Sequence, residues 1–383
     1  MEKRYSLARY TTGAVAARTG DEMSGPALLL AGLAATGSAT AASAILAGLT
    51  VSAAVGGPVF GVLLDRSPRP GRLLACTLTL YAMALGALLL SLGRVPVACT
   101  VLIAAAGGLL GPALSGGWTS QLPRVVAPGA LPRANALDAM TFNLASLAGP
   151  ALAAAAAASA GAPSGVAGSA TLICLALPAA RALPERSVTE GTAARRRVHT
   201  DLTAGFLAIA RSPTLARATT ASVVSCVGSG ALLACTPLLG ERVLGGADRG
   251  AVLLGVAAVA ALAANTLLSR RPGLLRPDTV VRLSTVVLAA APALAATGRP
   301  VPVAASAVLT GIGEGPQLTA LFAIRHREAP ARLRGQIFTT GASLKLTGFA
   351  IGAAIAGPLA TWSLPGALLA AAGVQLLAAA SSF

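Results

Sequence analysis

The stretch LLACTLTLYAMALGALLLSL, residues 73–92, decides the fold of this chain, because it contains no charged residue. A helix needs roughly 20 apolar residues to cross the hydrocarbon core of a bilayer. Uncharged or nearly uncharged runs of similar length recur, for example at residues 41–64, 97–117 and 301–324, and the basic residues lie between them. The pattern predicts an integral membrane protein with many spanning helices.

The composition excludes an ordinary water-soluble domain. Hydrophobic residues make up 55% of the 383 residues and charged residues 11%, and the mean hydropathy is +0.75. Only helices and closed barrels satisfy every backbone group in lipid, and these runs are too long and too uniformly apolar for barrel strands. We therefore predict an all-α membrane protein, with helices packed closely at small residues such as Gly107-Gly108 and Gly116-Gly117.

About twelve spans can be drawn along the chain. We place them at residues 10–37, 40–64, 72–92, 95–117, 134–160, 164–183, 212–240, 250–268, 278–297, 300–323, 336–360 and 363–381. The longest polar break divides them six and six. We predict an N-terminal six-helix bundle at residues 1–184, a cytoplasmic linker at 185–201 and a C-terminal six-helix bundle at 202–383, the two bundles being pseudo-symmetric.

Three short similarities at one offset of 204 residues indicate that the halves are duplicates. They pair Pro26-Ala27-Leu28-Leu29 with Gly230-Ala231-Leu232-Leu233, Asp65-Arg66 with Ser269-Arg270, and Gly111-Pro112 with Gly315-Pro316. Paired six-helix halves that hold a substrate near the bilayer midplane are a recurring plan of transporters.

The basic residues predict the orientation. Of the 29 Lys and Arg residues, 20 fall at the N-terminus and in alternate loops, whereas the opposite loops hold only Arg94, Arg242, Arg249 and Arg299. By the positive-inside rule both termini are predicted to be cytoplasmic, in a cell (inner or plasma) membrane. The net charge of +16 does not indicate a nucleic acid partner, because no stacking aromatics accompany the one arginine triple, residues 195–197.

No catalytic or metal site is predicted. The five cysteines lie within or beside apolar runs without a CxxC motif, and the two histidines, His199 and His326, are far apart in sequence. No P-loop is present. We therefore expect no enzyme activity, no cofactor and no metal.

The sharpest motif joins the second and third spans. It reads Gly61-Val-Leu-Leu-Asp65-Arg66-Ser-Pro-Arg69-Pro-Gly71-Arg72. Its carboxylate can accept hydrogen bonds from a helix N-terminus, and its arginines can pair with carboxylates or lipid phosphates. The motif resembles the G-x-x-x-D-R-x-G-R loop of the major facilitator superfamily, lengthened before Gly71. The resemblance implies a twelve-helix transporter fold with a cytoplasmic gate of Gly61, Asp65, Arg66, Gly71 and Arg72; the alternative is an ordinary basic loop.

Further motifs resemble the drug-efflux and macrolide-exporter branch of that superfamily. They are Thr19-Gly20-Asp21, Thr36-Gly37-Ser38, Gln121-Leu122-Pro123, Ala134-Asn135-Ala136 and Gly149-Pro150. In the family, a Gly-Pro pair in the fifth helix is associated with antiport. The resemblance thus implies that Gly149 and Pro150 form a bending element, and a plain packing kink is the alternative.

Ionisable residues inside the spans are candidates for function, because burying charge in lipid is costly. They are Asp21, Glu22, Asp138, Glu314 and Lys345. We predict that all but Asp138 serve coupling or line a substrate cavity; Asp138, about one turn past Arg133, favours an interfacial cap or ion pair. Two alternatives remain open: an Arg18–Glu22 ion pair at i, i+4 spacing, and a Glu314–Lys345 pair that is structural.

The most consistent function is proton-coupled export of a small, fairly apolar compound by alternating access. The expected partners are this small-molecule substrate, the proton and the lipid bilayer, and we expect a monomer. An importer or facilitator on the same fold is an alternative, and so is a polytopic membrane protein that transports nothing.

Overall fold

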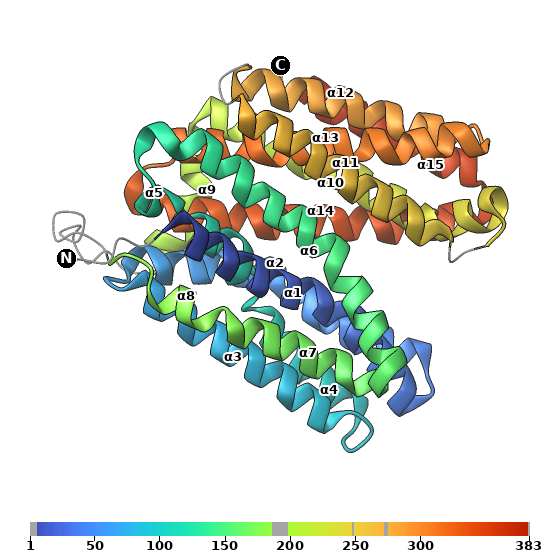
Figure 1. Cartoon of the computed structure of the whole chain (residues 1–383), viewed down its shortest axis with the longest axis horizontal. Coiled ribbons are helices and arrows are strands. Elements are labelled where there is room, and N and C mark those ends of the chain that lie inside the picture. Colours follow the sequence, from blue (N-terminus) through green and yellow to red (C-terminus); the bar gives the residue numbers. More distant parts are fainter. Residues whose placement is uncertain (1–5, 186–197, 247–248, 272–274, 382–383) are drawn as a thin grey trace. The chain divides into compact units, whose positions relative to one another are not determined.

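The computed structural model of this chain describes residues 6–185, 198–246, 249–271 and 275–381 (Figure 1). The regular structure of this described part is entirely helical. Eleven of its helical segments are long and apolar enough to cross a membrane. The predicted linker at residues 185–201 lies mostly outside the described residues.

The long helices match the predicted spans, with ends that differ by a few residues. They are α1 (Leu7–Thr36), α2 (Ala39–Arg66), α3 (Pro70–Ser91), α4 (Val97–Gly108) continued by the π-helix η1 (Ala113–Gly117), α6 (Leu131–Ala160), α7 (Ala162–Leu175) continued by α8 (Leu177–Arg181), α10 (Pro213–Leu239) continued by η4 (Gly240–Leu244), α11 (Arg249–Arg270), α12 (Pro277–Ala295), α13 (Pro300–Glu328), α14 (Arg334–Trp362) and α15 (Leu364–Ser381). Short helices α5 (Leu122–Val125), η2 (Pro128–Ala130) and η5 (Ala331–Leu333) lie in the connections.

Helix α1 is the long helix that falls outside the eleven apolar segments, although it has 30 residues. Its middle carries Arg18, Asp21 and Glu22, which lower its hydropathy. Arg18 and Thr19 are only 2% and 5% exposed. Polar residues are tolerated in this helix because several of them are turned toward protein rather than lipid.

The fourth predicted span is not one continuous α-helix. Helix α4 ends at Gly108, and the chain makes two tight turns, Leu110 N to Gly107 O at 2.9 Å and Ala113 N to Leu110 O at 3.0 Å. Pro112 has no N–H to continue the α-helical ladder, and the chain resumes as the π-helix η1. Proline therefore explains the break, which the apolar pattern could not show.

Helix α9 (Val198–Arg211) was not expected from the sequence. It begins inside the predicted linker and precedes α10. Phe206 and Leu207 are 45% and 43% exposed on it, while Ile209 is buried. A helix with exposed apolar residues that precedes a membrane-spanning helix in sequence is suited to the bilayer interface.

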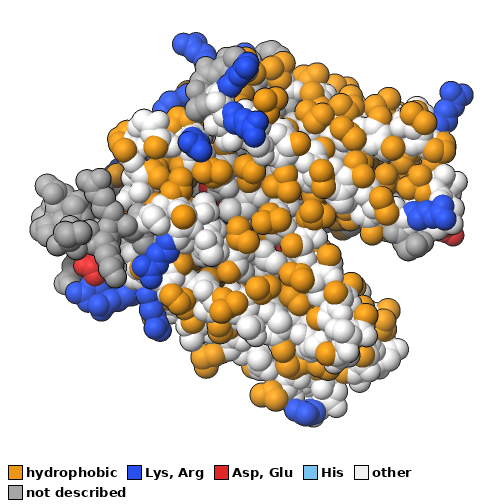
Figure 2. Space-filling view, in the orientation of Figure 1, with side chains coloured by type: hydrophobic (Ala, Val, Ile, Leu, Met, Phe, Trp, Pro, Cys, Tyr) orange, Lys and Arg blue, Asp and Glu red, His pale blue; other side chains and the backbone are white. Residues whose placement is uncertain are grey.

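The surface agrees with a lipid environment. Large hydrophobic side chains are exposed along the helices, including Val51, Leu80, Leu102 and Leu267, each more than half exposed. Figure 2 shows hydrophobic side chains over the flanks of the helices and Lys and Arg gathered near helix ends. Such a surface is soluble in hydrocarbon between two charged interfaces.

Contacts divide the chain into two compact units. Unit 1 holds Met1–Ala130, Leu144–Ala208 and Ala329–Ser343, and unit 2 holds Leu131–Asn143, Ile209–Glu328 and Leu344–Phe383. The first turns of α6 thus belong to unit 2, and the first turns of α14 to unit 1. The predicted domains, 1–184 and 202–383, follow the chain instead and stay a prediction.

The two units repeat one pattern of helix pairs. In unit 1, α1 packs on α7, α2 on α4, and α3 on both α4 and α7. In unit 2, α10 packs on α15, α11 on α13, and α12 on both α13 and α15. Figure 1 shows α3 beside α7 and α12 beside α13. The correspondence confirms the predicted pseudo-symmetric halves.

Within unit 1, the start of α14 packs against one face of α2 that is formed mostly by small residues. Ala53, Gly57, Gly61 and Asp65 follow one another at intervals of four and so share one helix face. A Cβ on Gly61 would lie 2.5 Å from Gln336 Cα, and one on Gly57 would lie 2.9 Å from the Thr339 carbonyl carbon. The glycines are therefore required for this close approach.

A methyl group at Gly61 tests that packing. We expect Gly61→Ala to destabilise the protein by about 1–3 kcal/mol, because the added carbon overlaps the backbone of α14. Thermal unfolding in detergent measures it. Gly86→Ala in α3 is the matched control, since nothing lies within 4 Å of its Cβ position, and it should keep or raise the melting temperature. Equal melting temperatures for the two variants would contradict the prediction.

Candidate functional site

Asp21 lies in the middle of α1 and is held by a tyrosine of α3. Tyr81 Oη donates to Asp21 Oδ1 at 2.9 Å, and Ser24 Oγ lies 3.2 Å from the same phenol oxygen. Ser24 Oγ also donates to the Asp21 carbonyl at 2.6 Å. The carboxylate of Asp21 is therefore bound by an uncharged hydroxyl inside unit 1.

Close packing of α1 on α7 places Asp21 there. A Cβ on Gly20 would lie 2.7 Å from Ile173 Cγ1 and 2.8 Å from the Ser169 carbonyl oxygen. Ser169 Oγ donates to the Gly20 carbonyl at 2.6 Å. Because Gly20 has no side chain, α1 packs directly against α7, and this close contact fixes the position of the Asp21 carboxylate that follows it.

Glu22, the next residue of α1, is exposed. Helix α6 approaches it at Gly149, whose Cβ position is 2.7 Å from Glu22 Cβ and 2.8 Å from Met23 N. Pro150 follows inside the helix, where it removes a backbone donor. The predicted bending element is therefore also the point at which α6 meets α1 in unit 1.

The neighbouring arginine has a partner on another segment. Arg18 is buried, and its Nη2 donates to Thr119 Oγ1 at 2.9 Å, just past η1. The alternative pairing of Arg18 with Glu22 stays a prediction. Asp138, expected at an interface, is fully buried on α6 in unit 2, where Thr141 Oγ1 donates to its carbonyl at 2.7 Å.

Glu314 and Lys345 interact electrostatically in unit 2. The Glu314 carboxylate accepts a hydrogen bond from Ser229 of α10 and is attracted by Lys345 of α14. The Cys226 thiol lies in the field of both groups. Gly311 and Gly315 bring α13 against α11, since their Cβ positions fall on the backbone at Ala257 and Ala261.

A hydrogen-bonded network lies further along the same helices. Gln317 Nε2 donates to Ser225 Oγ at 3.2 Å, and Ser225 Oγ donates to Gln375 Oε1 at 2.8 Å. Gln375 Nε2 donates to the Ser225 carbonyl at 3.0 Å. These three buried side chains join α10, α13 and α15 and satisfy one another in the apolar interior.

Asp65 caps the N-terminus of α14. Its Oδ1 accepts from Gly335 N and its Oδ2 from Gln336 N, both at 2.8 Å and both within unit 1. The first N–H groups of a helix have no partner in the helix and carry partial positive charge. The hydrogen bonds that the motif suggested for Asp65 are present.

The rest of the motif forms the turn between α2 and α3. Pro70 is the first residue of α3, so the lengthened segment before Gly71 ends one helix and starts the next. Gly71 is buried, with its Cβ position 2.5 Å from the Ala180 carbonyl oxygen, while Arg66 and Arg72 are exposed. Arg69 Nε pairs with Glu185 Oε1 at 3.1 Å in an exposed ion pair.

Two hydroxyls of the site were missed from the sequence. Tyr81 lies in the uncharged stretch at residues 73–92, and a phenol at that depth needs a hydrogen-bond partner. That signal could have paired Tyr81 with one of the intramembrane carboxylates. Ser229 carried no such signal, because serine can bond to its own helix backbone.

A metal site is not formed by the residues that the structure describes, where no group of three His, Cys, Asp or Glu side chains comes together. In unit 2, His326 Nδ1 lies 2.9 Å from Asn135 Oδ1, and both residues are buried. His326 is thus engaged with an amide of α6.

A family model described as the Major Facilitator Superfamily matches residues 11–277. The chain belongs to the major facilitator superfamily. A relative from Sinorhizobium fredii, named as the uncharacterized MFS-type transporter y4rN, is 28% identical over 357 residues, which are 88% of this chain and 83% of the relative. The chain is therefore a multi-pass integral membrane protein.

Solved structures of transporters share the fold. The human organic anion transporter MFSD10 (TETRAN) has a TM-score of 0.82 at 15% identity over all of both chains. A bacterial homologue of the iron transporter ferroportin has 0.79 at 17% over 98% of each chain. The E. coli fucose:proton symporter FucP has 0.72 at 15% over 98% of this chain and 97% of its own. These three proteins are named for different transported compounds. The assignment of this chain to the drug-efflux branch therefore stays a prediction.

A double-mutant cycle tests the pairing of Glu314 with Lys345. We expect Glu314→Gln and Lys345→Met each to lower the apparent melting temperature in detergent, because each leaves one charge without its counter-charge. The double variant should be more stable than the sum of the single effects predicts, with a coupling of about 0.5–3 kcal/mol. Additive effects would show that the two charges act separately.

Proposed function

We propose that this superfamily member is a secondary active transporter that exports a small, fairly apolar compound in exchange for protons, by alternating access. The observation that carries the proposal is the capping of α14 by Asp65, two charge-assisted hydrogen bonds between segments 270 residues apart. The motif match, the paired carboxylates and the likeness to transporters support it.

The Asp65 contact has the properties of a gate. It joins the last turn of α2 to the first turn of α14, and it is made of a few strong, directional bonds rather than of continuous apolar packing. Such a contact can be broken and remade as a unit. We assign Gly61, Asp65, Arg66, Gly71 and Arg72 to this gate and place it at the cytoplasmic face.

Asp21 and Glu314 are suited to carry protons, because their hydrogen-bond partners are hydroxyls. Tyr81 and Ser229 can donate to a carboxylate or accept from a carboxylic acid. Asp278, by contrast, is held by two guanidinium nitrogens of Arg327 at 3.2 and 3.3 Å, which favour its charged form. Glu22 and Lys345 lie beside the two candidate carriers and complete the proposed coupling or substrate set.

The proposed direction of transport and the proposed membrane location rest on sequence patterns. The efflux-branch motifs favour export, and the basic loops favour a cell membrane with both termini cytoplasmic. A substrate with few charges suits helix bundles whose interiors present few fixed charges. We also propose that the protein is a monomer. An importer or facilitator on the same fold is the second candidate, which the transport assay below separates from export.

Asp65→Asn tests the gate. Asparagine keeps the shape but offers one acceptor oxygen and no charge, so the cap on α14 weakens; hydrogen bonds to charged groups contribute about 1.5–3 kcal/mol each. We expect transport to fall about 10-fold with normal amounts of protein in the membrane. Glu185→Gln, which removes a nearby but exposed ion pair, is the control and should stay within about 2-fold. Equal transport by both variants would remove the gate assignment.

Inverted membrane vesicles with an acidic interior test direction and coupling. An exporter should load such vesicles with compounds from a panel of small lipophilic antibiotics and dyes, and collapse of the pH gradient should stop the loading. Asp21→Asn and Glu314→Gln should abolish the response to the gradient. Loading only in right-side-out vesicles would favour import, and flux untouched by either variant would refute the proposed proton carriers.

A further inference from the structure

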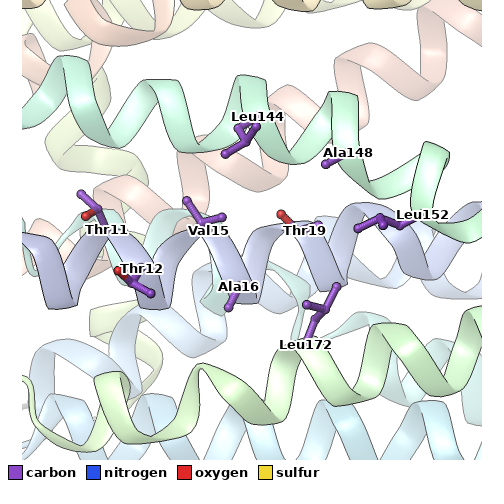
Figure 3. A pocket seen from close by; sticks show the side chains of 9 residues that line it. All are labelled: Thr11, Thr12, Val15, Ala16, Thr19, Leu144, Ala148, Leu152 and Leu172. Carbon is purple, nitrogen blue, oxygen red and sulfur yellow. The ribbon is translucent and has the colours of Figure 1, made fainter.

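An apolar groove of about 520 Å³ lies in unit 1 among α1, α6 and α7 (Figure 3). Its walls are Thr11, Thr12, Val15, Ala16 and Thr19 of α1, Leu144, Ala148 and Leu152 of α6, and Leu172 of α7. Leu144 and Leu152 are 38% and 43% exposed along its edge. The volume falls in the range of about 300–1,000 Å³ that is usual for small-molecule sites.

One buried hydroxyl in this groove has no hydrogen-bond partner. Thr19 is 5% exposed, and its Oγ1 finds no donor or acceptor among the described residues. Figure 3 shows this oxygen on the edge of α1 that faces α6, near Leu144 and Ala148. A buried hydroxyl without a partner is costly, so the groove is incomplete when empty.

The other two threonines of the groove are satisfied within α1. Thr11 Oγ1 and Thr12 Oγ1 both donate to the Ala8 carbonyl, at 3.0 and 2.8 Å. Thr19 departs from this pattern. The groove therefore offers one hydrogen-bonding point on an otherwise apolar surface.

This groove is separate from the proposed proton carrier. Asp21 is two residues past Thr19, which places their side chains about 200° apart on the helix. Asp21 meets Tyr81 of α3, whereas Thr19 faces α6. The residues that line the groove are all uncharged.

We propose that the groove is a binding site for a neutral, largely apolar small molecule that carries one oxygen acceptor, such as a carbonyl, which accepts a hydrogen bond from Thr19 Oγ1. Uncharged walls exclude a cation or anion, because a charge there would lack a counter-charge. A saturated hydrocarbon chain would leave Thr19 without a partner. The proposal concerns binding alone and does not depend on transport or its direction.

Photolabelling of the full-length protein in lipid nanodiscs tests the site. The probe is an aryl methyl ketone with a trifluoromethyl diazirine, compared with its isopropyl analogue, which lacks the oxygen, and with a trimethylammonium analogue. We expect the ketone to label peptides that contain residues 11–19 and 144–152 at the lowest concentration of the three. Equal or stronger labelling there by the cationic probe would overturn the neutral assignment.

Matched variants separate the hydroxyl from the shape of the groove. Thr19→Val keeps the shape and should weaken ketone labelling about 5-fold without weakening the isopropyl probe. Thr12→Val, whose hydroxyl is used within α1, should change neither. Ala148→Phe should fill the groove and prevent labelling by both probes.

The controls keep the test decisive. Each variant must elute as the parent does in size-exclusion chromatography and unfold within a few degrees of it. If Ala148→Phe fails this criterion, Ala16→Leu, which adds bulk on the side of the groove toward Leu172, replaces it. Equal ketone labelling of the Thr19→Val and Thr12→Val proteins, or labelling that persists in the filled groove, would overturn the proposal.

Discussion

The carboxylate of Asp65 satisfies two backbone N–H groups at the start of α14, and the arrangement of unit 1 depends on this contact. A helix that begins among other helices has several amide protons without intrahelical partners, and each is expensive to leave unpaired. Asp65 supplies two acceptors and a negative charge at that positive end. The stripe Ala53, Gly57 and Gly61 then lets α14 lie directly on α2, where Ser343 Oγ donates to the Ala53 carbonyl at 2.6 Å.

Small residues serve the same purpose throughout both units. Lipid gives helices no hydrophobic reason to associate, so close van der Waals contact and interhelical hydrogen bonds must hold them together. Three glycines each place one helix against the backbone of another: Gly20 packs α1 against α7, Gly149 packs α6 against α1, and Gly311 packs α13 against α11. The same positions therefore determine how far polar side chains lie from their partners.

Four carboxylates of the two units have partners of two kinds, and the difference organises the proposed mechanism. Asp21 and Glu314 receive hydrogen bonds from hydroxyls, which serve either protonation state. Asp65 and Asp278 bind backbone N–H groups or a guanidinium, which favour the carboxylate. The first pair are the proposed proton carriers, whereas Asp65 belongs to the proposed gate and Asp278 forms an exposed ion pair.

The sequence by itself determined the class of fold, the twelve long helices and the twofold repeat, because lipid solubility and small-residue packing are properties of composition and spacing. It also singled out Asp65 as a helix-capping carboxylate and Asp21 and Glu314 as unusual charges. Tertiary structure alone decided which groups meet: Tyr81 with Asp21, Ser229 with Glu314, and Gly335 with Asp65, 270 residues away. It also revealed α9 and the break after Gly108. Those contacts depend on which helix faces touch, and a run of apolar residues carries little information about its own facing partner.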